Sequence, residues 1–151
     1  MERAQGIGGL FFRSDDPAAL ARWYRDALGI DAFSEEQNAV WQQAAGPTVW
    51  APFDRDTAYF GTSGQTWMVN LRVRDLDAML AQLRAFGAVV HDGIEAMPSV
   101  GRFARADDPE GNRFELWEPE ADATTPALAD AADPAVAGDP TSGAEPPEPG
   151  S

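Results

Sequence analysis

The chain has 151 residues, enough for one domain with a sizeable core, and a formal net charge of −14. It has no cysteine, no lysine and one histidine, His91, which excludes disulfides, thiolate and Schiff-base chemistry, and multi-histidine metal sites within one chain. The acidic balance argues against nucleic-acid binding, which needs a basic surface. The apolar run 7–12 is too short for a signal peptide or a membrane span, so we expect a cytoplasmic protein with no membrane partner.

The first half of the chain predicts a strand, a helix and three further strands. Residues 6–13 are apolar and predict the first strand. The helix is expected to begin with Asp16 as N-cap and Pro17 at its first position, and to end at Gly29. Three strand-like runs follow, near 30–35, 39–44 and 47–53.

The second half repeats this order. An apolar strand at 66–73 precedes a helix that Asp75 begins and Gly87 ends. Asp75 follows Asp16 by 59 residues (75 − 16), which indicates an internal repeat. Three strand-like runs again follow the helix, at 88–95, 101–107 and 112–118. The sequence therefore predicts an α+β fold made of two βαβββ modules, about 6–53 and 66–118.

The composition changes abruptly after Trp117. Eight of the 25 acidic residues and none of the 11 basic ones lie beyond it, which leaves residues 1–117 with a net charge of −6. Seven of the twelve prolines also fall there. Such a segment cannot bury enough apolar area to offset its ordering entropy. We therefore expect a single domain at 1–118 and a disordered acidic tail at 119–151.

The segment from Asp108 to Trp117 combines a turn with a strand. Pro109 presets the backbone for the turn, and Gly111 and Asn112 tolerate the left-handed conformation that closes it. In the strand, side chains alternate between two faces. Phe114 and Leu116 lie on one face, and Arg113, Glu115 and Trp117 lie on the other.

Three stretches of the sequence carry a family resemblance. They are Asp16-Pro17 with Trp23-Tyr24 and Leu28-Gly29-Ile30, then Val73-Arg74-Asp75-Leu76-Asp77 with Gly87-Ala88-Val89-Val90, and finally Asp108 to Trp117. In this order and spacing they resemble the two helices and the last strand of the vicinal oxygen chelate superfamily, which contains glyoxalases, extradiol dioxygenases and bleomycin resistance proteins. The resemblance implies paired βαβββ modules whose mixed sheet curls around a central cup, a small-molecule ligand, and a homodimer.

Strand alternation indicates which side chains face such a cup. The apolar row Val69, Leu71 and Val73 is expected to cover the second helix, so the opposite row faces the cup. The same argument applies to the other strands. The expected ligand-binding residues are Phe11, Arg13, Trp50, Met68, Asn70, Arg72, Arg113 and Trp117. Glu115 is the candidate general base or ligand anchor, and a structural ion pair between Arg72 and Glu115 is an equally good interpretation. Trp41 and Trp67 could not be placed.

The resemblance also implies four metal-ligand positions in the metal-dependent relatives. They fall on Gly9, near Trp50, on Met68 and on Glu115. Only Glu115 offers a charged oxygen, and His91 occupies none of the four positions. We therefore expect neither a metal nor another cofactor.

Two functions follow from these observations. The first is metal-free binding or sequestration of a polar or aromatic small molecule, as in bleomycin resistance proteins. The alternative is a lyase, isomerase or oxygenase of the glyoxalase and dioxygenase kind, with Glu115 as base or with an unconventional metal site.

Overall fold

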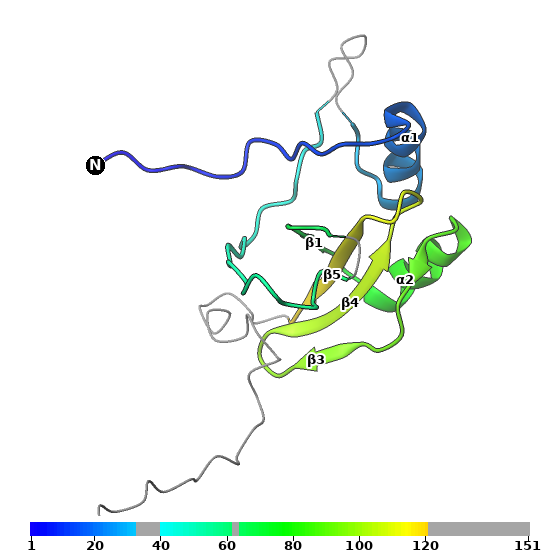
Figure 1. Ribbon diagram of the computed structural model, residues 1–151. Helices are drawn as coiled ribbons and strands as arrows, with labels where there is room; N and C mark the ends of the chain where they lie inside the picture. The colour runs from blue at the N-terminus through cyan, green and yellow to red at the C-terminus, as the bar shows by residue number, and fades with distance from the viewer. Residues whose placement is uncertain (33–39, 62–63, 121–151) are drawn as a thin grey trace, which may run out of the picture.

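The computed structural model describes residues 1–32, 40–61 and 64–120 (Figure 1). The helices are α1 Pro17–Leu28 and α2 Leu76–Ala85, and the strands are β1 Val69–Arg72, β2 Val89–Val90, β3 Glu95–Met97, β4 Gly101–Asp107 and β5 Arg113–Pro119. No helix within these ranges is long and apolar enough to cross a membrane. The predicted tail lies outside the described residues from residue 121 onward.

The strands form one mixed sheet. Its order is β1-β5-β4-β2, with β3 also paired to β4. The β1–β5 pair is parallel, whereas β4 runs antiparallel to β2, β3 and β5. The sheet is open, with β1 at one edge (Figure 1). The α+β class is therefore confirmed. The second βαβββ module is confirmed too, with the run 88–95 divided between β2 and β3.

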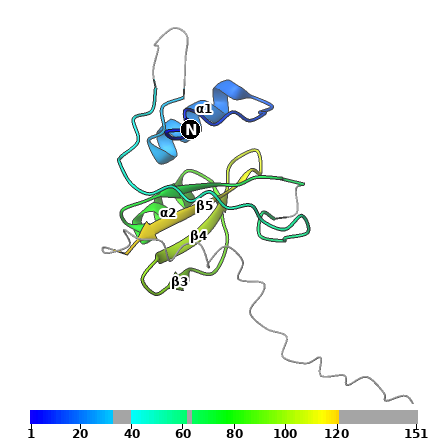
Figure 2. The ribbon, with the colours of Figure 1, turned by 90° about the vertical axis from the view of Figure 1, so that its left-hand side faces the viewer.

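Both helices begin and end as the sequence predicts. Asp16 accepts a hydrogen bond from the backbone of Ala19 at 2.9 Å, and Gly29 ends α1 with a φ of 68°. Asp75 accepts an equivalent bond at the start of α2, and Gly87 follows its end with a φ of 79°. Figure 2 shows α1 beyond one end of the sheet.

The core lies between α2 and one face of the sheet. Leu76, Leu80 and Leu83 form the buried stripe of α2. Phe114 and Leu116 of β5 contact this stripe. The remaining members of the buried core are Ala27, Ala104 and Ala106, with Trp23, Val69, Leu71 and Val73 packed around them. The predicted alternation of β1 and β5 is therefore confirmed, and neither of the two helices in the described ranges lies on the opposite face of the sheet.

The strands predicted for the first module are wrong where the structure describes them. Residues 6–13, 40–44 and 47–53 form no strand, and the runs 30–35 and 39–44 fall partly outside the described residues. Glycines occupy three of the four positions 6–9, and both Pro47 and Pro52 lie in the run 47–53. Glycine and proline weaken strands, so apolar character alone does not hold these segments in a sheet.

The turn between β4 and β5 is organised by a buried aspartate. The carboxylate of Asp108 accepts hydrogen bonds from the backbone of Glu110 and Asn112, both at 2.9 Å, and from the Asn112 side chain at 2.8 Å. It also accepts a bond of 3.0 Å from the Tyr24 hydroxyl on α1. Gly111 has the expected positive φ of 81°. Asn112 does not, so its contribution is its side-chain amide rather than a left-handed backbone.

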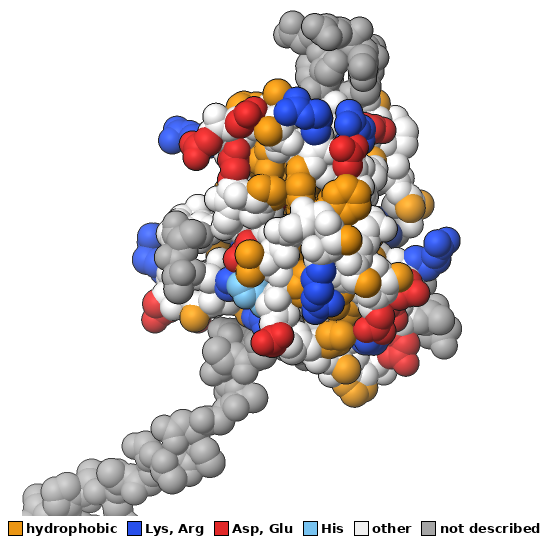
Figure 3. Space-filling view, turned by 90° about the vertical axis from the view of Figure 1, so that its right-hand side faces the viewer, with side chains coloured by type: hydrophobic (Ala, Val, Ile, Leu, Met, Phe, Trp, Pro, Cys, Tyr) orange, Lys and Arg blue, Asp and Glu red, His pale blue; other side chains and the backbone are white. Residues whose placement is uncertain are grey.

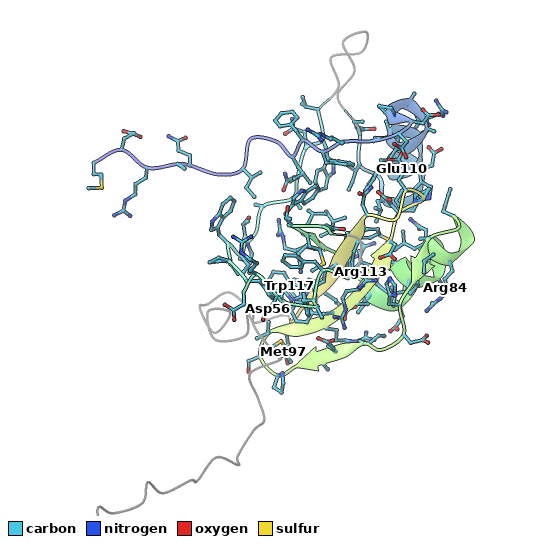
Figure 4. All side chains as sticks on the ribbon, viewed as in Figure 1. Asp56, Arg84, Met97, Glu110, Arg113 and Trp117 are labelled. Atoms are coloured by element: carbon cyan, nitrogen blue, oxygen red, sulfur yellow. The ribbon has the colours of Figure 1, made fainter. Side chains whose placement is uncertain are left out.

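Glu110 connects the same turn to the start of α1. Its carboxylate accepts hydrogen bonds from the Ser14 hydroxyl at 2.8 Å and from the backbone of Asp15 and Asp16, both at 3.0 Å. These contacts join positions about 95 residues apart in the sequence. Figure 4 shows Glu110 beside α1, away from Arg113 and Trp117 on β5. Hydrogen bonds from Asp16, Ser14 and Asp15 lower the pKa of Glu110 below its ordinary value of 4.5.

The lowered pKa of Glu110 predicts a specific acid dependence. A carboxyl group whose pKa is lower in the folded state than in the unfolded state stabilises the fold at any pH above its unfolded pKa. This stabilisation is lost as the pH falls toward and through the folded-state pKa. Wild type is therefore expected to be more stable than Glu110→Gln at neutral pH, and the difference should shrink below pH 4.5. Urea unfolding at stepwise pH measures it, with Glu2→Gln on the exposed N-terminus as control. A difference that stays constant with pH would refute this role.

Candidate functional site

Three side chains from neighbouring strands meet on the helix-free face of the sheet. Glu115 of β5 is directly opposite Asn70 of β1 and Arg105 of β4 in the strand register. Side chains opposite one another on the same face of a sheet lie close enough to interact. The register therefore surrounds one carboxylate with an amide on one side and a guanidinium on the other.

Glu115 is buried and fully hydrogen-bonded. Only 7% of it is exposed. One carboxylate oxygen accepts a short hydrogen bond from the Tyr59 hydroxyl, and the other accepts one from the Asn70 amide at 2.6 Å. Burial raises the pKa of Glu115 above its ordinary value, and the bonds from Tyr59 and Asn70 and the charge of Arg105 offset this only in part. Glu115 therefore holds its proton more tightly than an ordinary glutamate.

Aromatic side chains from the segment 53–60 cover this carboxylate. The Tyr59 ring stacks on Phe53 with 5.4 Å between ring centroids, and Phe60 contacts Phe53 at 5.1 Å. The Arg105 guanidinium lies 4.8 Å from the centre of the Tyr59 ring and pairs with Glu95. In Figure 1 this segment runs along the side of the sheet opposite α2. We call Phe53, Tyr59 and Phe60 the aromatic cover.

The structure places the predicted site residues in three groups. Asn70 lies on the same face as Glu115, as strand alternation predicts, and contacts it. Arg113 and Trp117 share its face of β5, but Trp117 is 2% exposed, stacks on Phe103 and donates to the carbonyl of Val100 at 3.1 Å. Trp117 is therefore part of the interior. Phe11, Arg13 and Trp50 are exposed, Phe11 at 93% and Trp50 at 85%, and Met68 is half-buried.

Arg72 does not pair with Glu115. Its guanidinium donates instead to the carbonyls of Ala44 at 2.7 Å and Ala45 at 3.1 Å. It lies so close to Gly46 that a Cβ there would be 1.5 Å from Nη1. The Arg72–Glu115 ion pair considered from the sequence is therefore wrong, and Arg72 anchors the segment 44–46 to the end of β1.

The described residues also enclose a cavity of about 350 Å³ away from Glu115. It lies at the helix side of β1, between the end of α1, α2 and Trp41. Leu71, Val73 and Met79 supply apolar walls, and Arg72 reaches its rim. None of the residues around Glu115 lines it. We place the candidate site at Glu115 rather than in this cavity because a buried carboxylate with a raised pKa lies there, among the polar side chains of Tyr59, Asn70 and Arg105.

Comparison with known sequences decides the family. The sequence profile of the glyoxalase-like domain matches residues 9–117, which is most of the chain. The chain belongs to the glyoxalase-like family, within the vicinal oxygen chelate superfamily. The resemblance noted from the sequence is thereby confirmed. No curated protein sequence matches the chain.

Several solved structures are similar to parts of this glyoxalase-like protein. An antibiotic binding protein from Streptomyces sp. CB03234, TnmS3, is 40% identical over 34% of this chain and 41% of its own, with a TM-score of 0.31. A glyoxalase/bleomycin resistance protein/dioxygenase superfamily member from Sphaerobacter thermophilus is 33% identical over 32% and 39%, with a TM-score of 0.30. A glyoxalase-related enzyme from Fulvimarina pelagi is 15% identical over 76% and 88%, with a TM-score of 0.45. The chain thus spans about two fifths of the first two proteins.

The metal that the superfamily implies does not fit these residues. Gly9 has no donor, Met68 and Trp50 are poor ligands for hard ions, and both oxygens of Glu115 already accept hydrogen bonds. Within 1–32, 40–61 and 64–120, no group of three or more His, Cys, Asp or Glu side chains could hold a metal ion. The donor set of this glyoxalase-like protein therefore disagrees with a family-type metal centre.

Sequence reasoning missed two residues of the site. Tyr59 lies between the two modules, where no periodicity singles it out. Arg105 lies in a strand that was predicted, at 101–107, and its alternation with Ala104 and Ala106 would have placed it on the face of Glu115. For Arg105 the signal was present in the sequence.

Proposed function

We propose that this glyoxalase-like protein binds a polar or aromatic small molecule, without a metal, on the helix-free face of its sheet. Glu115 is the polar anchor of the site, and the aromatic cover supplies a stacking surface. The observation that carries the proposal is the burial of Glu115 with two hydrogen-bond donors and, among the described residues, no ion pair. A buried carboxylate without a direct cation is costly to the fold, which is typical of functional sites.

The ligand is expected to reach Glu115 from the β1 edge of the sheet. Asn70 lies on this edge strand and is exposed, although it contacts the buried carboxylate. Tyr59 blocks the other oxygen, so a hydrogen-bond donor of the ligand has to replace its hydroxyl. TnmS3, which is 40% identical over 34% of this chain, is an antibiotic binding protein, and antibiotic binding is a function of the proposed class.

If the ligand displaces the Tyr59 hydroxyl from Glu115, two variants should change the ligand affinity in opposite directions. Glu115→Gln is expected to weaken binding by about 1–3 kcal/mol, because a charged acceptor is lost. Tyr59→Phe is expected to strengthen it by about 1 kcal/mol, because the competing hydroxyl is absent. A thermal-shift screen of small aromatic molecules with hydrogen-bond donors identifies the ligand, since a ligand at 100 times its Kd adds about 2.7 kcal/mol of stability.

The two variants are compared by calorimetric titration with the best compound. Glu120→Gln, just beyond β5 and exposed, is the matched control and should bind as wild type. Equal affinity of wild type and Glu115→Gln would refute the anchor. Weaker binding by Tyr59→Phe would show that Tyr59 is a ligand contact rather than a competitor.

A second candidate function rests on the raised pKa of Glu115. A carboxyl with a raised pKa suits a general base, and a positioned base contributes about 10²–10⁴-fold to a rate. The alternative is thus a metal-independent isomerase or lyase with Glu115 as base. Turnover of a compound found in the screen, lost in Glu115→Gln, would favour this function over sequestration.

We also propose that the protein forms a homodimer. The support is the exposure of large apolar side chains in the first half of the chain, such as Val40, Val49 and Trp50. A symmetric pair would bury part of this surface. Light scattering at micromolar concentration is expected to give twice the monomer mass, and a monomer mass would contradict the proposal.

A further inference from the structure

The single histidine of the chain lies on the same face of the sheet as Glu115, with Arg105 of β4 between them. His91 follows β2, and its backbone donates to the carbonyl of Arg105 at 2.9 Å. Its Nε2 is 2.8 Å from a carboxylate oxygen of Asp107 on β4. Asp107 is two residues from Arg105 along the strand, about 7 Å. About a third of the His91 side chain is exposed, and Figure 3 shows the histidine at the surface among charged side chains.

Asp107 is held ionised and in place by a second partner. Arg113, directly opposite on β5, donates from Nε to the same oxygen of Asp107 at 3.0 Å. Burial alone would raise the pKa of Asp107, but the hydrogen bonds from Arg113 and His91 outweigh it, and the pKa is lowered. Arg113 is itself fixed against Gly61, where a Cβ would lie 2.7 Å from its guanidinium. A carboxylate with a lowered pKa and a second hydrogen-bond partner therefore faces the imidazole.

Two charged groups contact the same ring nitrogen of His91, the Asp107 carboxylate and the Arg113 guanidinium. A bare Nε2 lone pair 2.8 Å from an ionised oxygen would be repelled, whereas an Nε2–H group makes a charge-assisted hydrogen bond. We assign the proton of His91 to Nε2, the tautomer that bonds to the ionised Asp107; Arg113 Nη2, 2.9 Å from the same nitrogen, would be its donor in the other tautomer. The lone pair is left on Nδ1. A histidine oriented by a carboxylate is the arrangement that activates an imidazole.

We propose that His91 and Asp107 form a reactive dyad in which His91 Nδ1 attacks activated acyl compounds. Nδ1 bonds to the carbonyl carbon of an aryl ester, and the bond to the aryloxide breaks with its electron pair leaving on oxygen. Water then attacks the acylated imidazolium, which releases the carboxylic acid and leaves one extra proton on His91. That proton passes to the aryloxide, which becomes the phenol, and the imidazole is restored. The sum is ester plus water giving acid plus phenol. Asp107 is a positioning residue in this scheme, and the dyad does not depend on ligand binding at Glu115.

The composition makes the proposal simple to test. The chain has no cysteine and no lysine, so His91 is its only imidazole and no thiol or side-chain amine competes with it. Hydrolysis of p-nitrophenyl acetate by the full chain is expected to be about 10²-fold faster than by His91→Gln. Asp107→Asn should lose most of this rate, whereas Asp107→Glu, which keeps a carboxylate, should retain part of it. Asp92→Asn, the exposed neighbour of His91, is the matched control and should react as wild type.

Two outcomes would overturn the proposal. Equal rates for wild type and His91→Gln would show that the imidazole is not the nucleophile, and an unchanged rate in Asp107→Asn would remove Asp107 from the dyad. Circular dichroism establishes that each variant is folded. A further measurement needs no variant: modification of wild type by diethyl pyrocarbonate is expected to be faster than that of free N-acetylhistidine. A slower reaction would also count against the dyad.

Discussion

Replacing Phe114 with alanine is expected to lower the free energy of unfolding by about 3–5 kcal/mol. The side chain is 1% exposed and belongs to the core between β5 and α2. It also contacts Trp23 and Tyr24 of α1, with ring centroids 6.3 and 6.4 Å away. Truncation therefore leaves a cavity where both helices meet the sheet.

Urea unfolding measures this effect, and Phe11→Ala provides the matched control. Phe11 undergoes the same truncation but is exposed, so its loss should change stability by less than about 0.5 kcal/mol. Similar losses for the two variants would contradict the assignment of the core. A large loss in Phe11→Ala alone would mean that the first half of the chain is buried in solution.

Replacing Asp108 with alanine is expected to cost about 3 kcal/mol. The substitution leaves the backbone N–H groups of Glu110 and Asn112 and the Tyr24 hydroxyl without their acceptor. A buried polar group left unsatisfied costs about 1–3 kcal/mol, and water can reach part of this turn. Asp108→Asn, which keeps one acceptor oxygen, is expected to lose less.

The same unfolding measurement tests this prediction, with Asp92→Ala as the control at an exposed aspartate. A loss for Asp108→Ala no larger than that of the control would show that the turn holds itself without the carboxylate. Together with Glu110, Asp108 explains the sequence Asp-Pro-Glu-Gly-Asn as a structural element. It joins α1 to the β4–β5 hairpin and takes no part in the site at Glu115.

The second half of the fold could be predicted because its signals are local. Asp75 and Gly87 mark the ends of α2 through backbone chemistry, and the alternation of Phe114 with Glu115 marks the faces of β5. The first half could not be predicted in the same way. Residues 6–13 are apolar, but a strand also needs a partner edge, and the sequence of one segment does not show whether that edge exists.

The candidate site was predictable to a similar extent. Strand alternation placed Glu115 and Asn70 on the same face of the sheet, and in the structure their side chains are in contact. Strand alternation could not identify Tyr59, because Tyr59 lies in an irregular segment 56 residues before Glu115 in the sequence. Sequence reasoning excluded His91 from the metal-ligand positions and assigned it no partner, because its pairing with Asp107 depends on the register between β2 and β4.

A crystal structure of the protein with the best compound from the thermal-shift screen tests the central claim most directly. The account predicts that a hydrogen-bond donor of the compound lies within about 3 Å of the Glu115 carboxylate. The Tyr59 hydroxyl should be displaced and Asn70 retained. A compound found in the cavity beside Trp41 and Met79, with the bond from Tyr59 to Glu115 intact, would contradict it.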